Sequence, residues 1–237
     1  MREQNIRFVV ASGNQYYQLI SFFPEIAHQI AFVAENGGWV VSGNEDVFNC
    51  QLPLHHFNAV VDHLQTLPNI EIIACGKRSA YTLNRYNDAL KNVAAKYYHR
   101  LELVDDFNHL DDAILKFGLN VPDSLIPEIQ PKLHAALGDM VTAVATGYGS
   151  IDLIMPGCTK PTACAFCSSA GALRIMRWWR SAIAAMISRC CSTPDLLCHG
   201  QRREDVKAVA SHHAPHNNEE GVLQIIDKVL NREAPFA

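Results

Sequence analysis

The side chains best suited to metal chemistry in this sequence are cysteines gathered in its last third. Six of the eight cysteines lie between Cys158 and Cys198, whereas Cys50 and Cys75 stand apart. Thiolates at such spacing suit tetrahedral zinc, and the possible ligands are Cys164, Cys167, Cys190, Cys191, Cys198 and His199. The alternative is that the spacing of these cysteines is a coincidence. The hydrophobic periodicity expected of folded helices and strands is lost in the same stretch. A structural zinc site is therefore one hypothesis.

Other groups of side chains admit both a functional and a structural interpretation. His212, His213 and His216 resemble metal ligands, since the first and last are four residues apart, but we expect them to be loop residues before a final helix. Ser12 ends the first apolar run, where serine often serves as a loop or capping residue. Arginines and tryptophans between Arg174 and Arg180 suggest a nucleic-acid surface, but the net charge of −4 argues against it.

Length and composition predict two compact units. The chain has 237 residues, of which 49% are hydrophobic and 19% charged, as in globular proteins rather than disordered chains or nucleic-acid binders. Its polar start at Met1 has no signal-peptide apolar region, and no apolar stretch is long enough to span a bilayer. We therefore expect a cytoplasmic protein that binds neither nucleic acid nor membrane.

Alternating strands and helices must position the candidate side chains. The apolar run 6–11 ends at Ser12-Gly13-Asn14, and the run 30–34 ends at Glu35-Asn36-Gly37, whose Asn-Gly pair favours positive φ. A helix is expected between these two strands and a hairpin after them. Strands that end in polar loops are typical of a parallel α/β sheet, in which ligands bind at the carboxyl ends of the strands.

From about residue 50 the pattern predicts an inserted α/β unit. Expected helices cover 57–67, 86–98 and 125–137, and expected strands cover 70–75, 101–104, 114–119 and 140–145. The run from Ser150 to Met155 then predicts a return to the first sheet. The predicted domains are residues 1–49 and 150–237 for the core and 50–149 for an α/β cap of plausible domain size.

Four short runs occur in a suggestive order along the chain. They are Val9–Asn14, Val33–Gly37, Ile151–Gly157 with Lys160, and Asn217–Val222. In order and spacing they resemble the Cof-type sugar-phosphate phosphatases of the haloacid dehalogenase superfamily, over residues 1–157 and about 204–237. This resemblance implies an α/β fold, with a Rossmann-like parallel-sheet core and an inserted α/β cap domain.

The resemblance also implies an activity. In that family a DxDGT aspartate attacks phosphorus to form an aspartyl-phosphate, and a GDxxND loop binds Mg²⁺. A serine and a lysine hold the phosphoryl oxygens, and they correspond to Ser12, with Gly13 and Asn14 beside it, and to Lys160. The implied function is magnesium-dependent hydrolysis of small phosphate esters, with sugar phosphates as the expected class. The implied partner is a small phosphorylated metabolite.

Two motifs of the family are missing from the sequence. No aspartate precedes Ser12, so the first strand of the core and its DxDGT nucleophile are absent. Asp195 and Asp205 lack the glycine and asparagine that a GDxxND loop requires. We therefore expect no retained nucleophile, no retained metal ligand and no catalytic activity in this chain.

A shifted reading frame explains the segment 158–204. Tryptophan and methionine have single codons, so Met176–Arg180 can be back-translated with little freedom and read one base earlier. Read in this way, the segment 157–191 resembles the family's lysine motif, helix and magnesium loop, in that order. We interpret the segment as a frameshift that ends near Glu204 and the cysteines as its by-product. The alternative is a non-enzymatic zinc-binding or interaction protein built around them.

Overall fold

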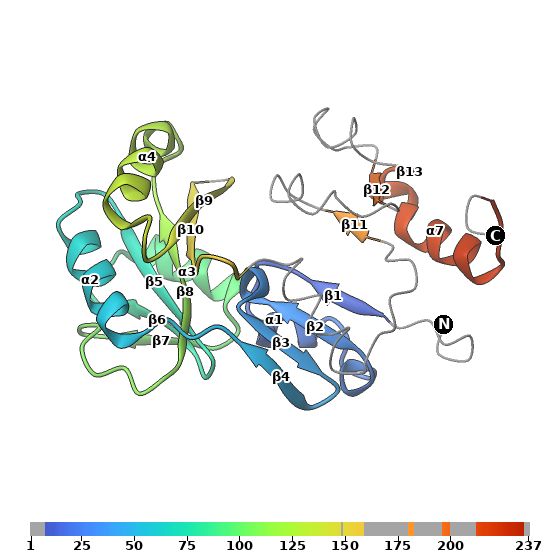
Figure 1. Cartoon of the computed structure of the whole chain (residues 1–237), viewed down its shortest axis with the longest axis horizontal. Helices are drawn as coiled ribbons and strands as arrows, with labels where there is room; N and C mark the ends of the chain where they lie inside the picture. Colours follow the sequence, from blue (N-terminus) through green and yellow to red (C-terminus); the bar gives the residue numbers. More distant parts are fainter. Residues whose placement is uncertain (1–7, 148, 159–179, 183–195, 200–211, 235–237) are drawn as a thin grey trace. The chain divides into compact units, whose positions relative to one another are not determined.

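The computed structural model describes residues 8–147, 149–158, 180–182, 196–199 and 212–234 (Figure 1). The chain divides into two compact units, one formed by Val9–Ala172 and the other by Met1–Phe8 with Leu173–Ala237. The first unit holds a four-stranded and a six-stranded sheet, and the second holds a three-stranded sheet. In the described parts of the chain, no helix is long and apolar enough to cross a membrane.

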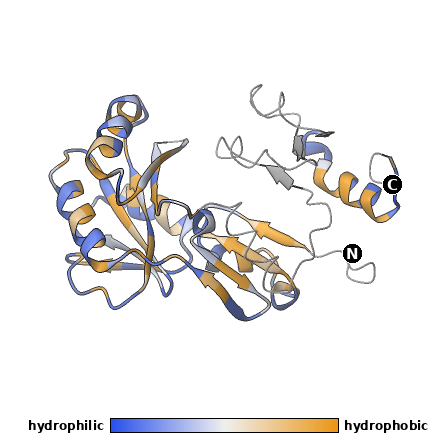
Figure 2. Cartoon of the chain, in the orientation of Figure 1, coloured by the Kyte–Doolittle hydropathy of each residue, from blue (hydrophilic) through white to orange (hydrophobic). Residues whose placement is uncertain are grey.

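The four-stranded sheet carries the two polar loops predicted at strand ends. Its strands, in spatial order, are β1 (Val9–Ala11), β2 (Ala31–Ala34), β3 (Trp39–Ser42) and β4 (Glu45–Asn49). β1 and β2 run parallel, whereas β2, β3 and β4 form an antiparallel meander. The helices are α1 (Tyr16–Ser21), η2 (Ala27–Gln29) and η3 (Glu35–Gly37). Figure 2 shows that β1, β2 and β3 are mainly hydrophobic.

The six-stranded sheet has the order β7-β6-β5-β8-β10-β9, antiparallel except between β6 and β7. Its strands are β5 (Glu71–Gly76), β6 (Ala80–Leu83), β7 (Leu101–Val104), β8 (Ile114–Asn120), β9 (Thr142–Gly147) and β10 (Ser150–Ile154). Its helices are α2 (Leu54–Gln65), α3 (Asp88–Tyr97), η4 (Asp123–Leu125) and α4 (Ile126–Leu137). The mixed α/β fold predicted from the sequence is confirmed.

Alternation along β8 and β10 separates an apolar face from a polar one. Phe117 and Leu119 of β8 and Leu153 of β10 belong to the cluster buried beneath α2 and α4. Successive residues of a strand point to opposite faces, so Lys116 and Asp152 are directed away from that cluster. They reach the loops of the four-stranded sheet instead, as described below.

The predicted return of Ser150–Met155 to the first sheet is wrong. β10 pairs with β8 on one side and with β9 on the other, so Asp152 lies opposite Gly118 and Val144. The physical reason is that β9 and β10 form a hairpin, and its apolar side chains complete the core of the six-stranded sheet.

The second unit contains a short parallel sheet and the last helix. Its elements are β11 (Arg180–Ala182), β12 (Leu196–His199), β13 (His212–Ala214), η7 (Asn217–Glu219) and α7 (Gly221–Leu230). β12 lies between β11 and β13 and runs parallel to both. Ile225 and Val229 pack against Ala214. His212 and His213 lie in β13, not in the predicted loop.

Candidate functional site

The loop Ser12–Asn14 lies at the carboxyl end of β1 and turns its carbonyl groups inward. Ser12 O accepts a hydrogen bond from Asn36 N at 3.1 Å, and Asn14 O accepts one from Glu35 N at 3.2 Å. Gly13 O accepts one from Lys116 Nζ at 2.7 Å. All three carbonyls are therefore satisfied within the protein, which leaves the outer side of the loop to hydrogen-bond donors.

Two hydrogen-bond donors of this loop have no acceptor in the described structure: the hydroxyl of Ser12 and the amide of Gly13. The Ser12 amide is used in a bond to Val33 O at 2.9 Å, and the Asn14 amide donates to Ser12 Oγ at 3.2 Å. Within the described residues, the Gly13 amide has no acceptor. Because the loop is partly exposed, these two donors can meet an anion from solvent.

The turn η3 provides the backbone donors that hold the loop. Glu35, Asn36 and Gly37 all adopt positive φ, at 48°, 59° and 104°. The predicted positive φ of the Asn-Gly pair is confirmed, and Glu35 is the residue that the sequence did not indicate, since a residue with a Cβ atom rarely adopts this conformation. The turn directs the Glu35 and Asn36 amides at the loop and buries both side chains.

A buried group of charges lies beneath the loop, and sequence reasoning missed it. Lys116 Nζ lies 3.3 Å from Glu35 Oε2 and 3.2 Å from Asp152 Oδ2, and the three side chains are 3%, 1% and 9% exposed. Asn36 Nδ2 also donates to Asp152 Oδ2. Glu35 Oε2 makes an ion pair with Lys116 but, in the described structure, its geometry does not satisfy that of a hydrogen bond. Fully ionised, the three groups would carry one net negative charge.

This environment shifts two pKa values upward. Burial raises the pKa of Glu35 above its ordinary value of 4.5, more than the nearby ammonium of Lys116 lowers it. Burial alone would lower the pKa of Lys116, but the carboxylates of Asp152 and Glu35 hold it well above its usual range. The charged lysine is therefore stabilised, whereas the charged form of Glu35 is disfavoured.

Glu35→Gln is expected to change how stability depends on pH. The folded-state pKa of Glu35 is raised, so its contribution to stability is complete below about pH 4.5 and is lost as pH rises through the folded pKa. Wild type should therefore lose melting temperature relative to Glu35→Gln as pH rises from 4.5 to neutrality, measured by circular dichroism. Glu128→Gln is the control, because a hydrogen bond from Lys132 lowers the pKa of Glu128 and both of these side chains are exposed. Parallel profiles for wild type and Glu35→Gln would contradict the expectation.

The described residues do not fit a magnesium ion. No group of three His, Cys, Asp or Glu side chains in these parts of the chain could hold a metal. The carboxylates nearest the loop, Glu35 and Asp152, already face Lys116 and Asn36. Among the other predicted site residues, Lys160 and the cysteines from Cys164 to Cys191 lie outside the described residues, and Cys198 and His199 lie in β12.

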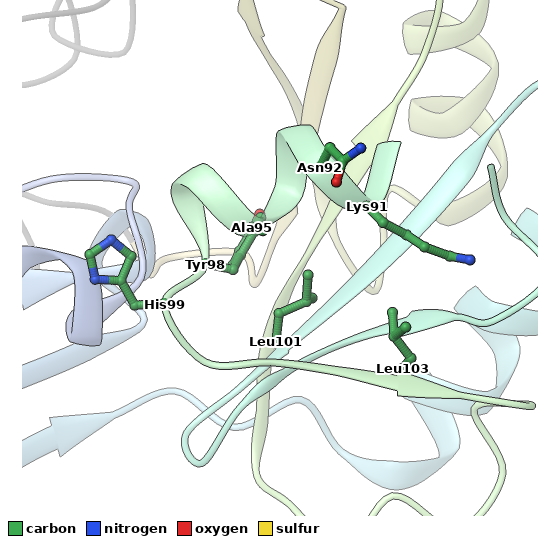
Figure 3. A pocket seen from close by; sticks show the side chains of 7 residues that line it. All are labelled: Lys91, Asn92, Ala95, Tyr98, His99, Leu101 and Leu103. Carbon is green, nitrogen blue, oxygen red and sulfur yellow. The ribbon is translucent and has the colours of Figure 1, made fainter. Parts of the chain in front are cut away.

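A separate pocket of about 580 Å³ lies beside α3 and β7 (Figure 3). Its lining residues are Lys91, Asn92, Ala95, Tyr98, His99, Leu101 and Leu103. None of them was a predicted site residue, and the loop Ser12–Asn14 does not contribute to it. We assign it no chemistry.

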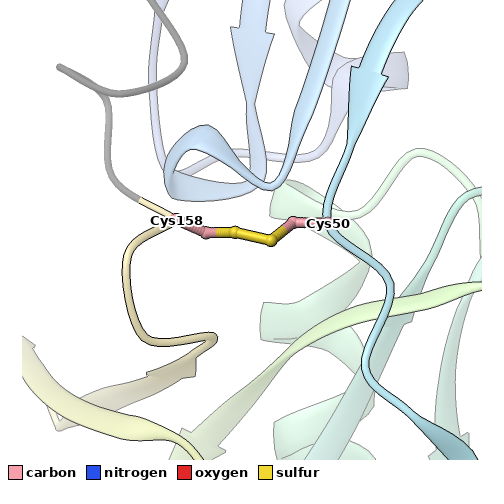
Figure 4. The surroundings of a disulfide bond; sticks show 2 residues. All are labelled: Cys50 and Cys158. Carbon is pink, nitrogen blue, oxygen red and sulfur yellow. A yellow bond between two sulfur atoms is a disulfide. The ribbon is translucent and has the colours of Figure 1, made fainter.

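Cys50 and Cys158 form a disulfide that the sequence did not predict (Figure 4). Cys50 directly follows β4, where the chain leaves the four-stranded sheet, and Cys158 follows β10, the last described strand of the six-stranded sheet. Their Cα atoms are 6.6 Å apart, although 108 positions separate them along the chain. The bond therefore joins the two ends of the segment that forms the six-stranded sheet.

Comparison with known proteins gives consistent results. The family model described as haloacid dehalogenase-like hydrolase matches residues 1–172. The 5-amino-6-(5-phospho-D-ribitylamino)uracil phosphatase YbjI of Escherichia coli (strain K12) is 52% identical over 245 residues, covering 100% of this chain and 88% of that protein. The crystal structure of SMU.1108c from Streptococcus mutans UA159 is similar with a TM-score of 0.89 and 25% identity, covering 97% of this chain and 88% of that one. The sugar phosphatase BT4131, of subclass IIB, shares the fold with a TM-score of 0.77 at 13% identity, covering 95% and 86%.

Proposed function

Because this chain belongs to the haloacid dehalogenase-like hydrolases, we propose that it binds small phosphate esters through the loop Ser12–Asn14. The observation that supports this most is the inward orientation of all three loop carbonyls. It leaves the Ser12 hydroxyl and the Gly13 amide as donors for phosphoryl oxygens. Lys160 is proposed as the neighbouring cation on the strength of the family resemblance.

We propose a sugar-like phosphate ester as the ligand. The name of the Escherichia coli relative describes a substrate with a phosphorylated ribityl chain, and 52% identity supports a similar class of ligand here. A cytoplasmic location fits a small phosphorylated metabolite of this kind.

We also propose that a chain of these 237 residues binds such esters without hydrolysing them. No Asp-x-Asp sequence occurs anywhere in it, so the carboxylates that would act as nucleophile and as general acid and base are not encoded. In the family, Mg²⁺ would neutralise charge on the transferred group, but the described residues offer no site for it. The frameshift interpretation of 158–204 accounts for the missing magnesium loop.

Titration with inorganic phosphate tests the binding site. We expect the backbone amide signals of Ser12, Gly13 and Asn14 to shift in ¹H–¹⁵N NMR spectra as phosphate is added. Ser12→Ala should weaken binding by roughly 10-fold, because it removes one hydrogen bond to a charged group. Ser21→Ala is the matched control, since the Ser21 hydroxyl bonds only to Gln18 O in the described structure. Equal affinity in wild type and Ser12→Ala would contradict the proposal.

A further inference from the structure

Lys116 connects the six-stranded sheet to the proposed phosphate loop. It lies in β8, 103 positions from Gly13 along the chain, and its Nζ donates to Gly13 O at 2.7 Å. Its side chain is only 3% exposed, so it is not available to a ligand from solvent. Lys116 can therefore affect ligand binding only through its contact with the loop Ser12–Asn14.

The peptide group between Gly13 and Asn14 makes two hydrogen bonds, and together they determine how the Ser12 hydroxyl is held. Its carbonyl oxygen is held by Lys116, and its N–H donates to Ser12 Oγ at 3.2 Å. A peptide group is planar, so fixing the carbonyl also fixes the direction of the N–H. That N–H occupies a lone pair of the Ser12 hydroxyl and thereby leaves its proton free to point elsewhere. Lys116 thus acts on Ser12 through one rigid unit.

No other group in the described structure replaces Lys116 in this contact. The carbonyls of Ser12 and Asn14 are held by backbone amides of η3, but Gly13 O is held by the lysine side chain. Without Lys116 the peptide could rotate and turn its carbonyl outward, where it would repel a phosphoryl oxygen.

Lys116 and Gly13 are themselves held in place from several sides. Asp152 and Glu35 attract the ammonium, and Asn36 donates to Asp152. The amide oxygen of Asn36 lies so close to Gly13 that a Cβ atom there would approach it to 2.5 Å. Glycine is therefore required at this position, and the loop has little freedom while these contacts persist.

We infer that Lys116 is a positioning residue for the phosphate site: it fixes the Gly13–Asn14 peptide and so directs the Ser12 hydroxyl toward a phosphoryl oxygen. This inference rests on the proposed function of the loop. Lys116 itself touches no ligand.

The test compares two variants that differ only at Lys116. Asp152→Asn retains an amide oxygen for Asn36 and leaves Lys116 bonded to Gly13 O. Adding Lys116→Met removes that bond while keeping a long apolar stem, and Lys116→Leu serves the same purpose if the methionine variant does not fold. We expect the double variant to bind inorganic phosphate about 10-fold more weakly than Asp152→Asn, by NMR titration. Its Asn14 amide should also shift in the absence of phosphate.

Leu133→Ala controls for lost stability, because Leu133 is buried in α4 and belongs to the cluster beneath α2 and α4. If the two Asp152→Asn proteins bind phosphate equally, or if Leu133→Ala weakens binding as much as the loss of Lys116, the inference is overturned.

Failure of the proposed function would look different. In that case wild type itself would show no phosphate-dependent shifts in the loop. The inference is then decided by hydrogen exchange of the Asn14 amide without phosphate, which should be about 10-fold faster when Lys116 is replaced. Unchanged exchange would overturn it.

Discussion

Purified protein with these 237 residues is expected to release no phosphate above background from sugar phosphates or p-nitrophenyl phosphate in the presence of magnesium. On the function proposed above, Ser12 and Lys160 hold the phosphate, whereas covalent catalysis also needs a nucleophile and a general acid and base. In the family these come from the DxDGT motif, and no Asp-x-Asp sequence occurs in these residues. Loss of such groups lowers turnover by roughly 10⁴-fold or more. Release of inorganic phosphate, measured colorimetrically, checks the expectation.

The positive control is a repaired protein. In it, a strand with the DxDGT motif is added ahead of residue 1, and the reading frame over 158–204 is corrected. We expect it to hydrolyse the same esters. Steady turnover by the 237-residue chain that Ser12→Ala abolishes would show that another residue serves as nucleophile. If the repaired protein were also inactive, the frameshift explanation would fail, although membership of the family would stand.

Lys116→Met is expected to destabilise the unit that contains both sheets by about 3–5 kcal/mol, because it leaves buried carboxylates without a counter-charge. Glu35 and Asp152 are 1% and 9% exposed, so water screens them poorly. Urea unfolding monitored by fluorescence measures the loss. Part of it should be recovered on acidification, since protonation removes the uncompensated charge.

Lys132→Met is the matched control for that measurement. Lys132 also pairs with a carboxylate, that of Glu128, but both side chains are more than half exposed on α4. An exposed pair of this kind contributes little to stability. If the two lysine variants had equal effects, the buried charges would not have the importance that we assign to them.

Most elements of the fold could be predicted because their periodicity is local. The helices α2 and α3 and the strands β2, β5 and β8 lie close to their expected ranges. β6 was missed, since its sequence Ala-Tyr-Thr-Leu shows neither an unbroken apolar run nor a strict alternation of apolar and polar residues. β10 was recognised as a strand but placed in the wrong sheet, because strand pairing depends on contacts distant in sequence.

The site shows the same division between local and distant information. Ser12 was assigned to the site from its resemblance to the family's serine motif, and the turn at Asn36 was predicted from its Asn-Gly pair, whereas Lys116 and Asp152 were not predicted. A signal was available: each is a charged residue inside an otherwise apolar strand, and such residues are seldom buried unless they are paired. This signal predicts that each charged residue is buried in an ion pair. It does not predict which residue is the partner, because that depends on how the strands align.

The disulfide has a consequence for how the protein responds to proteases. Cys50 and Cys158 close a covalent ring that includes every strand of the six-stranded sheet. Arg78 lies inside this ring with its side chain exposed, so trypsin can reach it. A single cut there would open the ring without releasing a fragment. The nicked protein would run as one species on a denaturing gel until a reductant separated it into two.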